Sequence, residues 1–134
     1  MDYKLQSIYD PVKYPFQEEI DKILKICVEV HKILGKGMLE VVYKDALELE
    51  FKNAGIDFER EKNYEINYKG VILPHKYFAD FVVMNNIILE IKASNAVAET
   101  FGKQILNYLT ISKCKVGLII NFGEEKLKVK KYIM

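Results

Sequence analysis

The stretch F-A-D-F-V-V-M-N-N-I-I-L-E-I-K-A-S, residues 78–94, decides how this chain can fold. Its apolar and β-branched residues predict two strands covered on both faces and joined by a tight turn at Asn85-Asn86. Three charged residues interrupt the pattern: Asp80, Glu90 and Lys92. Side chains alternate along a strand, so Glu90 and Lys92 share one face, and the turn brings Asp80 back toward them. Charges within an apolar hairpin are costly unless they are paired or bind a metal.

The rest of the chain predicts helices and strands on both sides of this hairpin. Helices are expected over 16–34, 39–53 and 96–112, and strands over 58–68, 71–73, 116–122 and 127–133. The inner face of the second helix is expected to include Val42, Ala46 and Leu49, with Tyr43 as a further candidate. That of the third helix is expected to include Val97, Phe101, Ile105, Leu106 and Leu109. Pro74 indicates an irregularity or an edge position. Because a helix separates the Glu90 strand from the apolar strand 116–122, these two strands should run parallel. The sequence therefore predicts an α/β fold with a mixed β-sheet flanked by helices.

Composition limits the class of protein. The chain has 134 residues, half of them apolar, which fits one folded domain and excludes a disordered chain. We expect an N-terminal arm over 1–15 and a single domain over 16–134. A net charge of +1 neither indicates nucleic-acid binding nor excludes a local basic face. No signal peptide or membrane span is evident, and Cys27 and Cys114 lack metal-ligand spacing, so a cytoplasmic protein with reduced thiols is expected.

The charged residues of the hairpin suit hydrolysis of a phosphodiester. Two carboxylates on adjacent strands can hold Mg²⁺ at about 2.1 Å per oxygen, leaving positions for water and phosphate. In this interpretation Asp80 and Glu90 are the metal ligands, and the backbone carbonyl of Ile91 is a third. Lys92 would contact the attacking water or the phosphate and favour the anionic form.

A simpler interpretation stays open at this point. Asp80 and Lys92 could form a cross-strand salt bridge, with Glu90 solvated. Glu-x-Lys by itself is a weak signal, because it also occurs at 50–52 and 124–126. Only the copy at 90–92 lies in an apolar strand behind another strand that carries an Asp.

Three further residues could belong to the same site. Gln104 and Tyr108 are four residues apart on the expected third helix and share a face, from which Gln could bridge water and Tyr could contact phosphate. Glu40 falls in the first turn of the second helix, where the helix dipole favours an acid. It could be a third carboxylate, acting directly or through a water. Each of the three could equally be a surface, packing or capping residue.

Together these motifs resemble the GxxExxY proteins of the PD-(D/E)XK nuclease superfamily. The matching pattern is Gly37-x-x-Glu40-x-x-Tyr43, then Asp80, Glu90-x-Lys92 and Gln104-x-x-x-Tyr108. The resemblance implies a restriction-endonuclease-like α-β-β-β-α-β core. It also implies that Asp80, Glu90 and Lys92 are the catalytic core, with Glu40 as a further acid and Gln104 and Tyr108 as an accessory pair. Ala79 stands where the superfamily motif has a proline.

The function expected from this resemblance is a Mg²⁺-dependent nuclease, with Mn²⁺ as a substitute metal and DNA favoured over RNA as substrate. The alternative is an inactive module of the same fold that binds nucleic acid or a protein partner. No membrane partner is expected. A third alternative is a homodimer whose two subunits bind one nucleic-acid duplex together.

Overall fold

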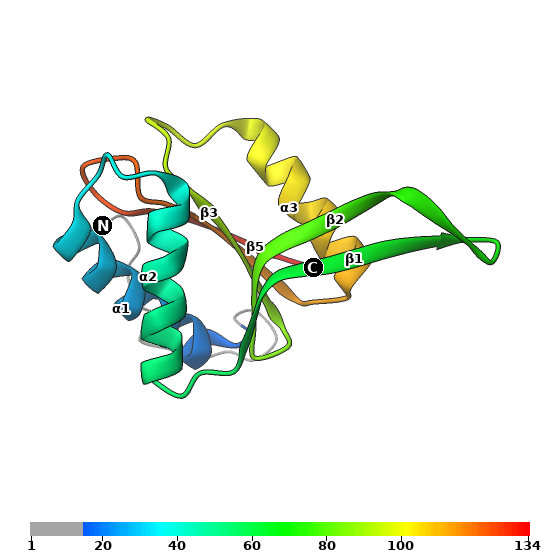
Figure 1. Ribbon diagram of the computed structural model, residues 1–134, viewed down its shortest axis with the longest axis horizontal. Coiled ribbons are helices and arrows are strands. Elements are labelled where there is room, and N and C mark those ends of the chain that lie inside the picture. Colours follow the sequence, from blue (N-terminus) through cyan, green and yellow to red (C-terminus); the bar gives the residue numbers. More distant parts are fainter. Residues whose placement is uncertain (1–14) are drawn as a thin grey trace.

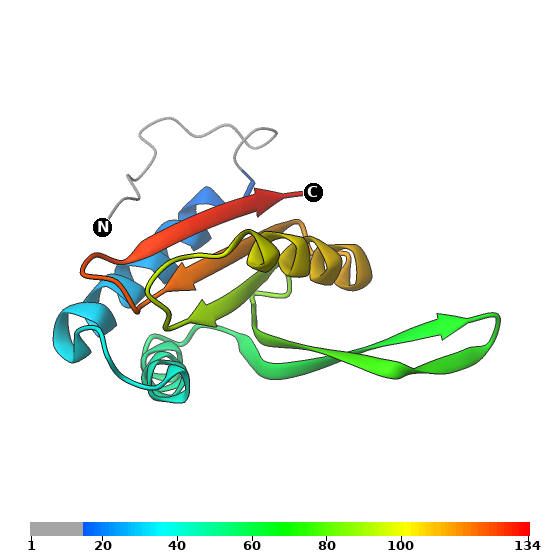
Figure 2. The same cartoon turned by 90° about the horizontal axis from the view of Figure 1, so that it is seen from above.

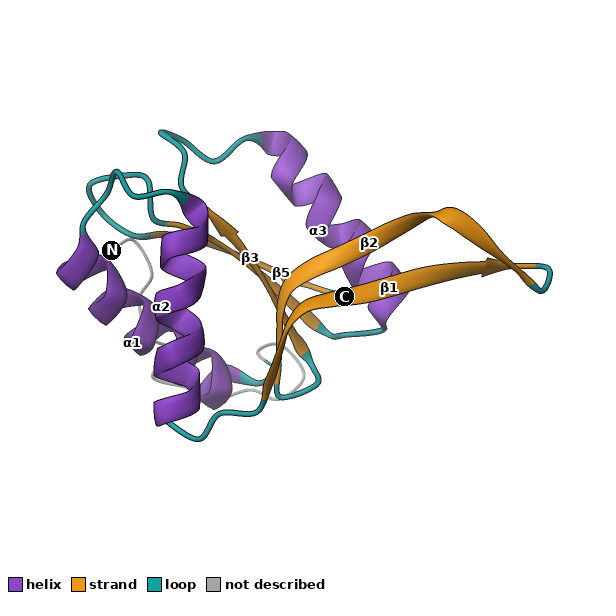
Figure 3. Cartoon of the chain, in the orientation of Figure 1, coloured by secondary structure: helices purple, strands orange, loops and turns teal. Residues whose placement is uncertain are grey.

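The computed structural model describes residues 15–134, which form three helices and five strands (Figures 1 and 3). The helices are α1 (Gln17–Leu34), α2 (Glu40–Asn53) and α3 (Glu99–Ser112), and the strands are β1 (Phe58–Tyr68), β2 (Val71–Val83), β3 (Ile87–Lys92), β4 (Val116–Asn121) and β5 (Lys128–Ile133). The expected N-terminal arm falls on residues 1–15, of which 1–14 lie outside the described residues.

The strands form one mixed sheet in the order β1-β2-β3-β4-β5 (Figure 2). Pairing is parallel between β3 and β4 and antiparallel elsewhere. The parallel pair is the expected one, because α3 carries the chain back across the sheet between β3 and β4. The predicted α/β fold with a restriction-endonuclease-like α-β-β-β-α-β core, here α2-β1-β2-β3-α3-β4, is confirmed.

Helices cover both faces of the sheet. Residues of α1 and α2 pack with one set of inward-facing strand residues, and residues of α3 pack with the other set (Figure 1). All six residues of β4 are buried, as expected for a strand that is covered on both sides. Gly117 allows α3 to lie close to β4, because a Cβ there would come within 2.8 Å of the Ile105 side chain. This close packing seats Tyr108, one turn farther along α3, against the sheet.

The inner faces of two helices differ from the expectation. Leu49 is 58% exposed and Leu106 is 40% exposed. The buried positions on α2 are Tyr43, which was a candidate for the inner face, together with Leu47 and Phe51; the three follow a four-residue spacing. Apolar residues occur on more than one side of α2, so their spacing alone does not select the buried face. Helix α3 also begins at Glu99 rather than at residue 96.

The outer parts of β1 and β2 extend beyond the body of the molecule as a two-stranded ribbon (Figures 1 and 2). We call residues 62–78 the β-ribbon. Its turn lies at Lys69 and Gly70, both with positive φ (52° and 84°), as a tight hairpin turn requires. Pro74 lies where the register shifts, which confirms the predicted irregularity. The large exposed apolar side chains of this ribbon are Tyr68, Val71, Ile72 and Phe78.

Both cysteines are buried and unpaired. Burial raises the pKa of the Cys27 thiol, which therefore stays protonated. Within residues 15–134, no helix has the length and apolar character needed to cross a membrane.

Candidate active site

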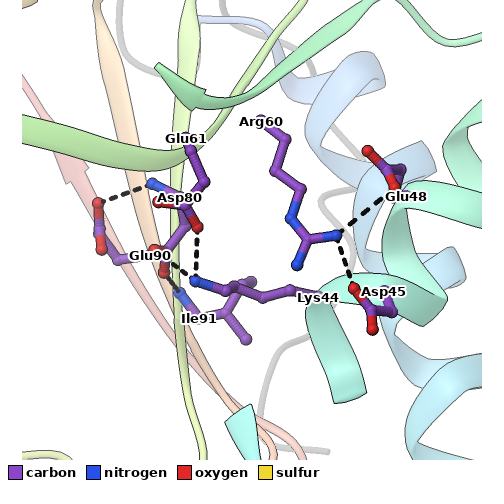
Figure 4. Close-up of polar contacts among 8 residues, drawn as sticks. All are labelled: Lys44, Asp45, Glu48, Arg60, Glu61, Asp80, Glu90 and Ile91. Carbon is purple, nitrogen blue, oxygen red and sulfur yellow. Dashed lines mark hydrogen bonds and ion pairs between the residues drawn. The ribbon is translucent and has the colours of Figure 1, made fainter. Parts of the chain in front are cut away.

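The backbone ladder between β2 and β3 ends at the pair Phe81–Leu89. Beyond it, carboxylates replace the backbone bonds (Figure 4). The Asp80 N–H donates to Glu90 Oε1 at 3.4 Å, and the Ile91 N–H donates to Asp80 Oδ2 at 2.7 Å. We call Asp80, Glu90 and Ile91 the acid fork. The fork holds two buried carboxylates side by side at the point where β2 leaves the sheet to form the β-ribbon.

The backbone of Ile91 is oriented toward the same gap. In a strand, the N–H and C=O of one residue point to the same side. The Ile91 N–H bonds Asp80, whereas the next carbonyl, that of Lys92, accepts from the Phe122 N–H at 2.8 Å on the other side. The Ile91 carbonyl is therefore directed toward β2, as its expected role as a ligand requires.

Burial and repulsion oppose the charge of Glu90. Burial contributes most and the nearby Asp80 carboxylate contributes next, and together they raise the pKa of Glu90 to about 9. Lys92 opposes this shift. Ionisation of Glu90 near neutral pH therefore needs additional positive charge at the fork.

Lys44 also lies at the fork, although none of the sequence motifs includes it. Its Nζ lies 3.2 Å from Asp80 Oδ1 and 2.7 Å from Glu61 Oε1 (Figure 4). Burial alone would lower the pKa of Lys44, but the bonds to Glu61 and Asp80 raise it above its ordinary value, so the amine stays charged. The available signal was helical spacing: Lys44 follows Glu40 by four residues and so shares its face of α2.

The charges at the fork influence the pKa of Glu40. Burial and the Asp80 charge raise its pKa, and Lys92 and Lys44 lower it. However, no group of three or more His, Cys, Asp or Glu side chains among the described residues could hold a metal ion. Within residues 15–134, Glu40, Asp80 and Glu90 therefore do not form a cluster of three acids, and the assignment of Glu40 to the site stays a prediction. Acids repel one another, and in this structure the Lys44 amine, not a third acid, stands beside Asp80.

Tyr43 fixes the start of α2 and with it the position of Glu40. Its hydroxyl donates to the Gly35 carbonyl at 2.6 Å and accepts from the Met38 N–H at 3.2 Å. Gly37, between these two, has a φ of 101°, a conformation that L side chains rarely adopt. In the Gly37-x-x-Glu40-x-x-Tyr43 pattern, the first and last residues thus shape the loop that leads into the helix.

Lys92 points to the α3 side of the sheet. Its Nζ lies 4.5 Å from the centroid of the Phe101 ring. It makes no salt bridge with Asp80 or with any other carboxylate of residues 15–134, so the simple cross-strand pair is not formed. Its N–H donors remain available beside Glu90.

The two accessory residues on α3 lie differently. Tyr108 is buried, and burial followed by the charges of Glu90 and Asp80 raises its pKa to about 12, so its hydroxyl is a donor. Its ring meets that of Tyr77 edge-on, with centroids 5.8 Å apart. Gln104 is exposed, and the structure does not bring it into a hydrogen bond within the described residues.

The donor set of the fork fits a hard divalent cation. Two carboxylates and a carbonyl are the ligand types that Mg²⁺ and Mn²⁺ prefer. The presence of the Lys44 amine at Asp80 Oδ1 shows that this position already attracts positive charge.

Comparisons with known proteins bear on the fold and on the family of the chain. A solved structure, that of SSO0001, is similar with a TM-score of 0.57 and 20% identity, covering 92% of this chain and 62% of that one. This likeness concerns the fold. No curated protein matches the chain. A family model for the PD-(D/E)XK nuclease superfamily matches residues 17–132. The chain therefore belongs to the PD-(D/E)XK nuclease superfamily.

Proposed function

We propose that this protein is a divalent-metal-dependent nuclease that hydrolyses phosphodiester bonds in nucleic acid, with DNA preferred over RNA. The observation that carries the proposal is the acid fork, where Asp80 and Glu90 lie side by side with the Ile91 carbonyl aimed at the same gap. Within the superfamily we assign the chain to the GxxExxY group, on the loop and helix start built by Gly37, Glu40 and Tyr43.

The proposed metal is Mg²⁺, with Mn²⁺ as a substitute. Asp80, Glu90 and the Ile91 carbonyl would hold it, with Glu40 taking part directly or through a water. When bound, the ion would supply Lewis-acid stabilisation of charge on the phosphate and on the attacking oxygen.

The other residues act by position and charge. Lys92 donates from beside Glu90 to the attacking water or to a phosphate oxygen, and its charge favours the anionic form of either. Tyr108 keeps its proton and donates to phosphate from α3. Gln104, one turn earlier on the same helix, orients water or substrate.

Cleavage of single- and double-stranded DNA and RNA, measured with Mg²⁺, with Mn²⁺ and with a chelator, tests the proposal. Asp80→Asn and Lys92→Ala should each lower the rate by about 100-fold or more, and the chelator should abolish it. Glu50→Gln and Lys52→Met change another Glu-x-Lys, at the far end of α2, and should leave the rate unchanged. Equal rates in wild type, Asp80→Asn and Lys92→Ala would contradict the proposal.

A second candidate is a module of this fold that binds nucleic acid or a protein without cleavage. The observation in its favour is Lys44, which already neutralises Asp80. A folded wild-type protein that binds an oligonucleotide but neither cleaves it nor binds Mn²⁺ would support this candidate. We also infer a reducing, cytoplasmic setting, because both cysteines are buried and unpaired.

A further inference from the structure

The two oxygens of the Asp80 carboxylate have different partners. Oδ2 accepts the Ile91 N–H at 2.7 Å, which holds the carboxylate in place. Oδ1 is the oxygen left for a cation, and the Lys44 Nζ lies 3.2 Å from it. The Asp80 side chain is 11% exposed and the Lys44 side chain 13%, so solvent weakens this contact little.

We propose that Lys44 is an internal counter-ion that competes with a divalent cation for Asp80 Oδ1. Metal binding displaces the amine from Asp80 and leaves it on Glu61. The inference rests on the proposed metal site, and it adds a positioning residue that the motifs of the sequence do not contain. Its consequence is reciprocal: whatever strengthens the Lys44–Asp80 contact weakens metal binding, and metal binding weakens that contact by the same factor.

The geometry allows this exchange at low cost. Glu61 holds the amine at 2.7 Å, closer than Asp80 does, so the displaced lysine keeps a partner. The four-carbon stem of lysine permits a small movement of the amine without a movement of the helix. After displacement the amine still lies beside the fork, where it can meet a phosphate.

A separate set of ion pairs keeps the surroundings in place. Arg60, the residue before Glu61 on β1, pairs with Asp45 at 2.7 Å and with Glu48 at 3.5 Å, both on α2 (Figure 4). These contacts hold α2 against β1 without Lys44. Substitution of Lys44 is therefore expected to leave the fold intact, which circular dichroism checks.

Lys92 does not fill the same role. Its Nζ rests over the Phe101 ring on the α3 side and makes no ion pair among residues 15–134. Each side of the fork thus has one amine, but only the amine from α2 occupies a carboxylate oxygen.

Calorimetric titration of the full chain with Mn²⁺ tests the proposal. Lys44→Met and Lys44→Gln should tighten Mn²⁺ binding by about tenfold, because the competing charge is gone. Lys44→Arg keeps the charge and should bind like the wild type. Lys52→Met removes an exposed lysine from the same helix and serves as the matched control.

Nuclear magnetic resonance of the lysine side chains gives a second readout that does not involve activity. Titration with Mg²⁺ should shift the Lys44 ε-signal, which is identified by its loss in Lys44→Met, and the shift should disappear in Asp80→Asn. Equal Mn²⁺ affinity in wild type and Lys44→Met would overturn the competition while leaving the metal site in place. Absence of Mn²⁺ binding in both folded proteins would overturn the metal site and the competition together. Binding by Lys44→Met alone would support the competition and favour the non-cleaving candidate for the wild type.

Discussion

The two halves of β2 differ sharply although they form one continuous strand. Residues 79–83 are buried between the helices, whereas residues 71–78 lie in the β-ribbon and are mostly exposed. Asp80 stands next to the boundary. The inner half packs in the core and so holds the acid fork in place. The outer half extends away from the body of the molecule. The buried residues 79–83 should therefore matter for the stability of the fold, whereas the exposed residues 71–78 of the same strand should matter little for it.

The largest expected contrast is between two phenylalanines of this strand. Phe81 is fully buried and its ring meets that of Phe51 edge-on, with centroids 5.5 Å apart. Phe78 is 49% exposed. Phe81→Ala should lower the free energy of unfolding by about 3–5 kcal/mol. Phe78→Ala should lower it by less than about 1 kcal/mol. Urea denaturation measures both, and equal losses would contradict the division of β2.

The next prediction compares the stability of the wild type and of Glu90→Gln as the pH changes. The pKa of Glu90 is about 9 in the fold, against an ordinary value of 4.5, so the folded state holds this proton more tightly than the unfolded chain does. Its contribution to stability is thus fully present below pH 4.5 and is lost as the pH rises toward 9. Glu90→Gln cannot lose a proton there.

Without metal, Glu90→Gln should therefore be about as stable as the wild type at pH 4.5 and more stable at pH 9, by on the order of a few kcal/mol. Urea denaturation in a chelating buffer at several pH values measures the difference. Glu50→Gln, near the C-terminal end of α2 and away from the fork, should show no such trend. A difference between wild type and Glu90→Gln that does not change with pH would show that the fork carboxyl is not held protonated.

The smallest effect is expected in the β-ribbon. Lys76 and Glu65 form an ion pair at 3.8 Å in which both side chains are more than 40% exposed. Such pairs contribute little because solvent screens them. Lys76→Gln should change the free energy of unfolding by no more than about 0.5 kcal/mol. A larger loss of unfolding free energy, measured by thermal or urea denaturation, would show that the β-ribbon contributes to the stability of the whole fold.

The sequence predicted those features that depend on neighbours along one strand. Alternation placed Glu90 and Lys92 on one face. The turn after β2 brings Asp80 beside Glu90, as the bonds of the fork show, although its positive-φ residues are Met84 and Asn85, one position before the predicted Asn85-Asn86. Short-range patterns suffice here because the turn fixes which residues meet.

Features that depend on helix packing were not predictable in the same way. Lys44 meets Asp80 across 36 positions of sequence, and this contact follows from how α2 lies on the sheet. The prediction that Leu49 is buried was wrong for the same reason, because the side chains of α2 that face the core are Tyr43, Leu47 and Phe51. The β-ribbon shows the opposite case. The strand over 58–68 was predicted correctly, but the segments 71–73 and 78–83, expected as separate strands, form the single strand β2. Alternation also does not reveal whether a core covers a strand.

We expect the acid fork to bind a divalent cation at Asp80 and Glu90. The most direct measurement is the anomalous difference map of a crystal soaked in Mn²⁺. We predict one strong peak at about 2.1–2.2 Å from Asp80 Oδ1 and from a Glu90 oxygen, with the Lys44 amine moved away from Asp80 and onto Glu61. A crystal without a peak at the fork, or with Mn²⁺ bound only elsewhere while Lys44 stays on Asp80, would contradict it.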